Sequence, residues 1–200
     1  MFLPYIEEDF MLKVSKLAET KLKDALDNYS KPVQGVRAIA EAKSPFQVSY
    51  GLSFVDEDSI KEDDLIIESG EIKVYIHADQ EKYFKGVTLD FEDGLKGSGF
   101  KFADIPRVPE EFKGTLAEKI VKVIDEEINP GIASHGGFVS LIDIKGKDVI
   151  IQMGGGCQGC GMANVTLKDG IEVALRNAIP EIGGIYDVTD HADGKNPYYK

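Results

Sequence analysis

The spacing of apolar residues predicts three amphipathic helices. Apolar positions recur every three or four residues, with charged residues between them, in ranges 12–28, 115–128 and 163–179. Thr115 with Glu118 three positions later is a typical N-terminal cap, and Asn129-Pro130-Gly131 is expected to end the second helix. Each helix has one apolar face, so each is expected to pack against another element of the fold.

Two groups of short apolar runs predict β-strands. The first group lies before residue 100, and acidic or glycine-containing turns separate its members, which are 35–39, 46–54, 65–67, 72–76 and 87–91. The acidic runs 56–58 and 62–64 are expected to be solvated turns, because they lack the alternating Asp pattern of a calcium loop. The second group consists of 138–144, 148–153 and 185–189, and Gly146 predicts a hairpin between its first two members.

An irregular stretch with two prolines, residues 104–114, separates the two groups of strands and is interpreted as a linker. The predicted domains are therefore residues 1–103 and residues 115–200. The first domain is β-rich, and the second has the element order α-β-β-α-β. The sequence thus predicts the α+β fold class, with one β-rich and one mixed domain.

Composition and charge exclude several classes of function. The chain has 200 residues, of which 42% are apolar, and this is enough for a buried core. It carries 35 acidic and 23 basic residues, for a net charge of −12, so it repels phosphate backbones and nucleic acid is not an expected partner. No apolar run approaches the ~20 residues of a membrane-spanning helix, and the first residues lack the basic and apolar regions of a signal peptide. We therefore expect no membrane contact and a cytoplasmic location.

The candidate chemistry lies in one tetrapeptide. Cys157 and Cys160 are the only cysteines, and a Cys-x-x-Cys turn brings two sulfurs close enough to hold one metal ion or to form a disulfide. Five glycines within 154–161 leave room for a bulky group near the backbone, and leave N–H groups available to point at it. The helix predicted from residue 163 places its positive end near the thiolates. Both cysteines are expected to lie in a loop outside the core.

Three kinds of chemistry fit two cysteines at this spacing. A thiol–disulfide oxidoreductase usually has Trp before the motif and Pro within it, whereas this chain has no Trp and has Gln158-Gly159 between the cysteines. A structural zinc site or an iron–sulfur cluster needs more ligands than the two thiolates of one chain. His77 lies at the other end of the chain, and His135 is expected to hydrogen-bond in a turn. A second copy of the chain would supply four thiolates, so a zinc-linked dimer and a cluster-linked dimer both stay open.

Residues 129–176 resemble the Nfu family, which is related to the C-terminal domain of NifU. The resemblance rests on three phrases, which are His135-Gly-Gly-Phe-Val-Ser-Leu, Gly154-Gly-Gly-Cys-Gln-Gly-Cys-Gly-Met-Ala and Val165-Thr-Leu-Lys-Asp-Gly-Ile-Glu. It implies an iron–sulfur cluster carrier in which Cys157 and Cys160 of two subunits hold one [4Fe–4S] cluster. The chain would then be a homodimer and not an enzyme, and it would take the cluster from an upstream scaffold and pass it to apo-proteins.

Residues 1–103 resemble the A-type carriers in a degenerate form. Gly35-Val36-Arg37 matches that family, but Lys43-Ser44-Pro45-Phe46 stands where the family has Cys-Ser-Gly-Phe. Residues 100–112 contain no counterpart of the family's later Cys-Gly-Cys. This domain therefore cannot hold a cluster in the A-type manner, and the resemblance implies that it recognises client proteins.

Overall fold

The computed structural model describes residues 11–94, 97–134, 136–157 and 163–189, with the backbone alone for 163–168. These residues form two compact units. The N-terminal unit contains the described residues up to 43 and residues 48–106, and the C-terminal unit contains residues 44–47 and the described residues from 107 onward. The predicted domain ranges and the linker at 104–114 stay predictions, although the stretch contains one 3-10 turn, η3 (Glu110–Phe112).

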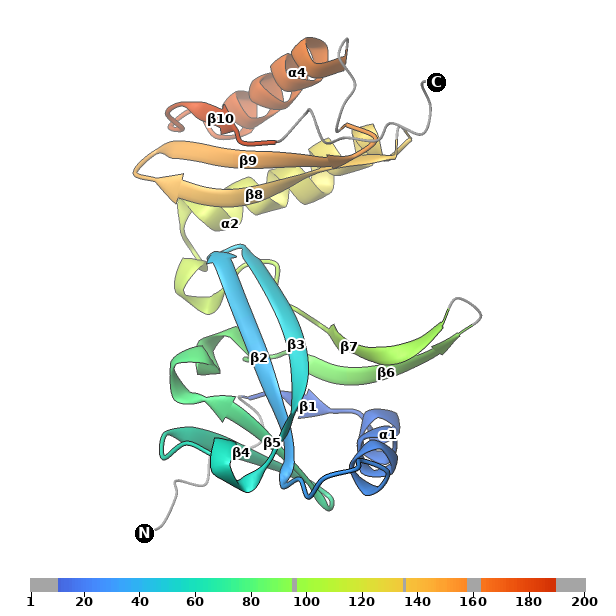
Figure 1. Cartoon of the computed structure of the whole chain (residues 1–200). Coiled ribbons are helices and arrows are strands. Elements are labelled where there is room, and N and C mark those ends of the chain that lie inside the picture. Colours follow the sequence, from blue (N-terminus) through green and yellow to red (C-terminus); the bar gives the residue numbers. More distant parts are fainter. Residues whose placement is uncertain (1–10, 95–96, 135, 158–162, 190–200) are drawn as a thin grey trace. The chain divides into compact units, whose positions relative to one another are not determined.

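The N-terminal unit consists of two small sheets and one helix (Figure 1). One sheet has the strand order β3-β2-β5-β4 and the other has the order β1-β6-β7. The elements are β1 (Lys13–Val14), α1 (Lys16–Asp27), β2 (Gly35–Ser44), β3 (Gln47–Val55), β4 (Asp64–Ser69), β5 (Ile72–His77), β6 (Thr88–Gly94) and β7 (Gly97–Ala103), with 3-10 turns η1 (Glu57–Ser59) and η2 (Ala78–Tyr83). Side chains from both sheets and from α1 share one apolar core.

The first helix begins later than the pattern of apolar residues predicts. Residues 13–14 form β1, which pairs with Thr88 and Leu89 of β6 in a parallel register. The Ser15 hydroxyl accepts a hydrogen bond from the Ala18 N–H at 3.1 Å and caps the helix, which therefore begins at Lys16. Leu12 precedes β1 and is buried, so it is not part of the apolar face of the helix.

One acidic residue of the predicted turns is buried. Asp64 is 3% exposed, and its carboxylate is held by the guanidinium of Arg37, with Nη2 at 2.7 Å from Oδ2. The prediction that residues 62–64 form a wholly solvated turn was therefore wrong for Asp64. Burial raises the pKa of this carboxyl, but the hydrogen bonds from Arg37 and from the Lys61 N–H, together with the positive charge of Arg37, outweigh burial and hold the pKa below its ordinary value.

Replacing Asp64 by asparagine is expected to destabilise the N-terminal unit by about 3–5 kcal/mol, because the Arg37 side chain, which is only 14% exposed, would lose its counter-charge. Chemical denaturation at neutral pH measures this loss. The contribution of the wild-type pair is present above the ordinary carboxyl pKa of about 3.9 and is lost as the pH falls through the lower pKa of the folded state. The control is Glu71→Gln, which breaks the exposed pair with Lys23 and should change stability little. An equal loss in both variants would contradict the argument.

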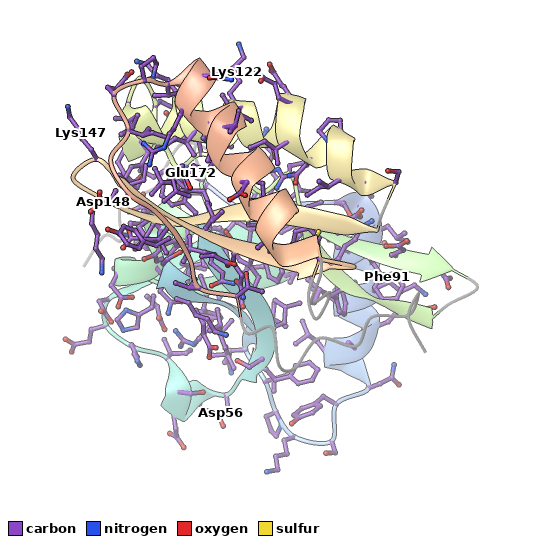
Figure 2. All side chains as sticks on the ribbon, turned by 90° about the horizontal axis from the view of Figure 1, so that it is seen from above. Asp56, Phe91, Lys122, Lys147, Asp148 and Glu172 are labelled. Carbon is purple, nitrogen blue, oxygen red and sulfur yellow. The ribbon has the colours of Figure 1, made fainter. Side chains whose placement is uncertain are left out.

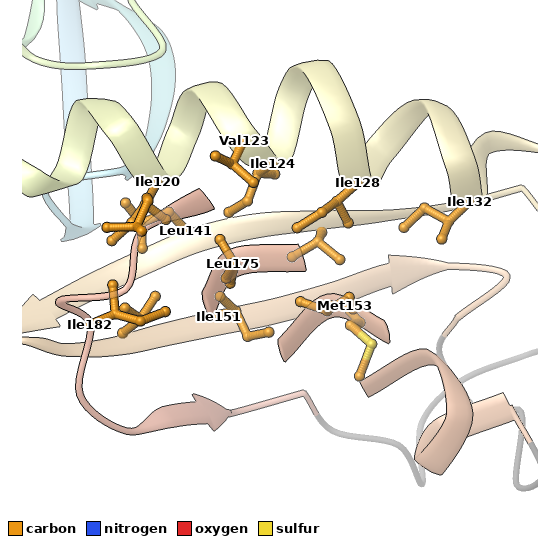
Figure 3. Close-up of a cluster of buried hydrophobic side chains, with 14 of the residues drawn as sticks. Ile120, Val123, Ile124, Ile128, Ile132, Leu141, Ile151, Met153, Leu175 and Ile182 are labelled. Atoms are coloured by element: carbon orange, nitrogen blue, oxygen red, sulfur yellow. The ribbon is translucent and has the colours of Figure 1, made fainter. Parts of the chain in front are cut away.

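The C-terminal unit has the order α-β-β-α-β that the sequence predicts. Its elements are α2 (Leu116–Val123), η4 (Ile124–Ile128), α3 (Asn129–Ala133), β8 (Gly137–Lys145), β9 (Asp148–Gly155), α4 (Ala163–Ala178) and β10 (Ile185–Asp187). The strand order is β10-β9-β8, with β8 and β9 antiparallel and β10 parallel to β9. Buried side chains of α2, α4 and the sheet form one core, in which Ile120, Ile151 and Leu175 meet (Figure 3).

The second helix does not end at Asn129-Pro130-Gly131. A π-helical turn, η4, follows α2, and the Asn129 N–H donates to the carbonyl of Ile124, five residues earlier. Pro130 then lies in the first turn of α3, which continues to Ala133. Ile128 and Ile132 are both buried, so the wide turn lets the helical path pass the proline and keep its apolar face on the sheet.

The hairpin turn of the C-terminal unit also anchors the last strand. The Asp148 carboxylate accepts a hydrogen bond from the Gly184 N–H at 2.7 Å, and the Lys147 carbonyl accepts one from the Gly183 N–H at 2.7 Å. Figure 2 labels Lys147 and Asp148 at this turn. These bonds hold β10 beside β9. Among the described residues, no helix combines the length and apolar character needed to cross a membrane.

Candidate functional site

Cys157 follows the C-terminal end of β9 and is held by a short turn. Strands β8 and β9 pair from Lys145↔Asp148 to Gly137↔Gly155, so the cysteine lies at the open end of the hairpin. Its N–H donates to the Gly154 carbonyl at 3.4 Å, and the Gly156 N–H donates to the Gly136 carbonyl at 2.9 Å. The prediction that the N–H groups of this loop stay available was therefore wrong for Gly156 and Cys157.

The side chain of Cys157 is buried. It is 3% exposed and belongs to the same apolar core as Ile132 and Met153. The prediction that both cysteines lie outside the core was therefore wrong for Cys157. The physical reason is that the turn after β9 directs the thiol back toward the start of β8.

Because Gly137 has no side chain, it leaves the space that the Cys157 thiol occupies. A Cβ atom built on Gly137 would lie 2.0 Å from the Cys157 Sγ and 3.2 Å from the Cys157 backbone nitrogen. Any side chain at residue 137 would therefore overlap the sulfur in this conformation. Gly137 belongs to one of the phrases that carry the family resemblance, but its contact with Cys157 follows only from the pairing of β8 with β9.

Two more glycines of the loop are needed for close packing. A Cβ atom on Gly154 would lie 2.3 Å from the ring of Phe138, its cross-strand partner. Gly155 has a φ of +62°, and a Cβ atom there would lie 2.2 Å from the Gly136 carbonyl oxygen. These glycines thus allow the end of β9 to approach β8 and the Phe138 ring closely. Phe138 itself is 50% exposed, on the opposite face of the strand from the buried Val139.

Asn129 ties the preceding helix to the strand that carries Gly137. Its side-chain amide donates to the Val139 carbonyl at 3.1 Å, and its side-chain oxygen accepts from the Val139 N–H at 2.7 Å. Since β8 is an end strand among the described strands of its sheet, this pair of hydrogen bonds satisfies backbone groups that have no partner in a described strand. Asn129 was predicted only to end a helix, and its two hydrogen bonds to the backbone of Val139 were not predicted.

The other predicted site residues are placed as follows. Cys160 and His135 lie outside the described residues. His77 belongs to the N-terminal unit, where its Nδ1 lies 2.9 Å from the Asp79 carboxylate. The backbone of α4 begins at Ala163, three residues after Cys160, as predicted. Among the described residues, no group of three or more His, Cys, Asp or Glu side chains is arranged to hold a metal ion.

Comparisons with known proteins agree on both halves of the chain. The family described as "Iron-sulphur cluster biosynthesis" matches residues 11–105, and the family described as "NifU-like domain" matches residues 120–186. The chain is similar to "Fe/S biogenesis protein NfuA" of Pseudomonas aeruginosa, with 33% identity over 94% of this chain and 98% of that protein. The protein of the same name from Stenotrophomonas maltophilia R551-3 is 32% identical over 94% of this chain and 96% of its own length.

Solved structures match the N-terminal half at low similarity. Escherichia coli SufA, described as involved in biosynthesis of iron–sulfur clusters, has a TM-score of 0.42 and 21% identity over 49% of this chain and 88% of its own. At these values the likeness adds no argument about function. The family assignment therefore rests on the NfuA proteins, which match 94% of this chain.

Proposed function

Because the chain belongs to the family of the Fe/S biogenesis protein NfuA, we propose that it carries an iron–sulfur cluster and passes it to apo-proteins. The cargo is a [4Fe–4S] cluster, and Cys157 and Cys160 are its ligands. The observation that supports this most directly is the position of Cys157 at the open end of the β8–β9 hairpin, three residues before Cys160. The protein is then a carrier and not an enzyme.

The number of ligands requires a second chain. One chain supplies two thiolates, and a four-iron cluster is held by four. A two-fold dimer that meets at this loop supplies the missing pair with the same residues. The positive end of α4, close in sequence to Cys160, favours both thiolates and the negative cluster.

Loading requires the Cys157 thiol to leave its buried place. With Sγ against Gly137 the sulfur is covered by the core, and a cluster between two chains needs it at the surface. We infer that the thiol turns outward when the cluster binds. During release, incoming client thiolates displace the cysteines one at a time, and the Cys157 thiol then returns to its buried position.

The N-terminal unit acts, in this proposal, as the docking part for apo-proteins. Residues 1–112 contain no cysteine, so this part of the chain has no thiolate for a cluster. An upstream scaffold supplies the cluster, and the whole cycle takes place in the cytoplasm.

Anaerobic reconstitution of the full chain tests the function. We expect about four irons and four sulfides per two chains, with the broad visible absorbance of a cluster, and a dimer in sedimentation velocity. The apo-protein should be mostly monomeric, because the cluster links the two chains. A monomer that holds a complete cluster would contradict the shared site. A colourless dimer with about one zinc ion would contradict the carrier function and indicate a structural zinc site instead.

A further inference from the structure

A groove in the N-terminal unit lies between end strands of the two sheets. It has a volume of about 340 Å³ and is lined by Tyr50–Leu52 of β3, Phe100–Phe102 of β7 and Ile105. Ile105 is 44% exposed. The lining therefore presents mainly apolar and aromatic side chains at the surface, in a part of the molecule that lacks cysteine.

Aromatic contacts fix the side chains that line this groove. Tyr50 stacks on Phe102 with ring centroids 5.1 Å apart, and its hydroxyl donates to the Tyr83 carbonyl at 2.8 Å. Phe100 packs edge-on against Phe91, which Figure 2 labels on strand β6. Because ring contacts and a hydrogen bond fix the lining side chains, a ligand would meet a surface that is already formed.

Both walls of the groove are strand edges. β3 is an end strand of the four-stranded sheet and β7 is an end strand of the three-stranded sheet, so in the described structure each has one strand neighbour. An end strand presents backbone N–H and C=O groups to which an extended peptide can pair, and its alternating side chains contact every second residue of that peptide. Three lining residues on each strand span about 10 Å, the length of three extended residues.

The net charge of this part of the chain favours a basic ligand. Among the described residues that line the groove, Lys101 is the charged one, and it is already held by Glu92 at 3.1 Å and by Asp90 at 4.0 Å. Residues 1–112 carry 23 acids and 14 bases, for a net charge of −9. A ligand with lysine or arginine beside its apolar residues would be attracted, and an acidic one would be repelled.

We propose that this groove binds an extended segment of an apo-protein client, with apolar side chains at alternate positions and basic residues at its ends. The inference rests on the proposed function, since it names the site and the chemistry through which the carrier recognises its clients. It assigns recognition to Tyr50, Phe100 and Ile105.

A fluorescent peptide tests this surface directly. The probe is Lys-Lys-Val-Thr-Phe-Thr-Val-Lys-Lys, and its fluorescence anisotropy is measured with the full chain at low salt. Ile105→Lys removes an apolar wall and adds a like charge, so we expect its affinity to fall by about tenfold or more. The matched control is Ile60→Lys, because Ile60 is similarly exposed, at 38%, and lies outside the groove. It adds the same charge to the same unit and should leave the affinity unchanged.

A second variant narrows the groove without touching its aromatic contacts. No heavy atom lies within 4 Å of a Cβ atom built on Gly51, so Gly51→Val should fold normally and should weaken peptide binding by about tenfold. Equal affinities for Ile105→Lys and Ile60→Lys, or equal binding of a probe with Glu in place of each Lys, would overturn the proposal. Burial of the groove by a second copy, seen as self-association that Ile105→Lys abolishes while the peptide does not bind, would overturn it as well.

Cluster content separates this inference from the proposed function. Each variant is also reconstituted, and its iron content should equal that of the wild type because the groove lies far from the cysteines in sequence. A wild-type chain that binds the peptide but takes up no cluster would remove the carrier function and leave the groove as a peptide site. A chain that takes up the cluster but does not bind the peptide would remove the groove proposal alone.

Discussion

Cys157→Ala is expected to abolish cluster retention. The dimer would then offer two thiolates where a [4Fe–4S] cluster needs four, so the iron content after reconstitution and desalting should fall to the background level. Cys160→Ala should have the same effect for the same reason. Iron and sulfide analysis of each variant, beside the wild type, measures the change.

The burial of Cys157 means that Cys157→Ala can also lower the stability of the fold. Cys157 lies in the apolar core, so Cys157→Ala also leaves a small cavity and should cost about 1–2 kcal/mol of stability. A loss of cluster could therefore come from weakened folding. Circular dichroism and a denaturation midpoint for each variant measure this cost.

Val149→Ala is the matched control. Val149 is fully buried in the same core, near the other end of β9, and its truncation has a stability cost of the same kind or larger. Both cysteines remain in this variant, so it should keep its cluster. Loss of the cluster in Val149→Ala would mean that the loss in Cys157→Ala could come from reduced folding stability alone. Iron retained by Cys157→Ala would contradict the ligand assignment.

The regular elements were predicted where one residue pattern dominates. The second and third helices and most strands have a clear period, because each buries one face on a neighbour. Strand β1 was missed because it has only two residues, and its partner, Thr88 and Leu89 of β6, is distant in sequence. Strand β7 was missed because glycine and serine occupy its start, although Phe100 and Phe102 alternate with Lys101 as in a strand.

Breaks in the pattern were harder to predict than the pattern itself. Pro130 usually marks a helix end, but here a π-helical turn precedes it and the buried Ile132 continues the apolar face. Asp64 belongs to an acidic run that is typical of a solvated turn, yet it is buried beside Arg37 from another strand. For Asp64 a contact distant in sequence decides the outcome, and single-sequence patterns do not contain that contact.

The same limit applies to the candidate site. The two cysteines and their glycine-rich surroundings were identified from the sequence, because their residue types and spacing are specific. The roles of Gly137 and Asn129 depend on how β8 pairs with β9 and on how α3 approaches β8. Burial of Cys157 also depends on this pairing, and it bears directly on how a cluster could load.

Gly137→Ala is expected to drive the Cys157 thiol out of its buried place. The new Cβ atom would overlap Sγ, which is the movable end of a side chain, whereas the Cys157 backbone nitrogen would lie in tight contact at 3.2 Å. Overpacking of this kind costs about 1–3 kcal/mol, and rotation of the sulfur relieves it. The equilibrium between buried and released thiol should therefore shift by about 5–150-fold toward release.

Thiol reactivity in the apo-protein measures this shift. The experiment uses a Cys160→Ala background, in which Cys157 is the only thiol, and follows its reaction with a chromogenic disulfide under conditions that keep the protein folded. Gly131→Ala serves as the control, because residue 131 lies in α3 and a Cβ atom there has no heavy atom within 4 Å. The Gly137→Ala protein should react about 5–150-fold faster, and the control should react at the rate of the parent. Equal rates in all three would mean that the thiol does not depend on residue 137 for its burial, and the outward rotation proposed for cluster loading would lose its structural basis.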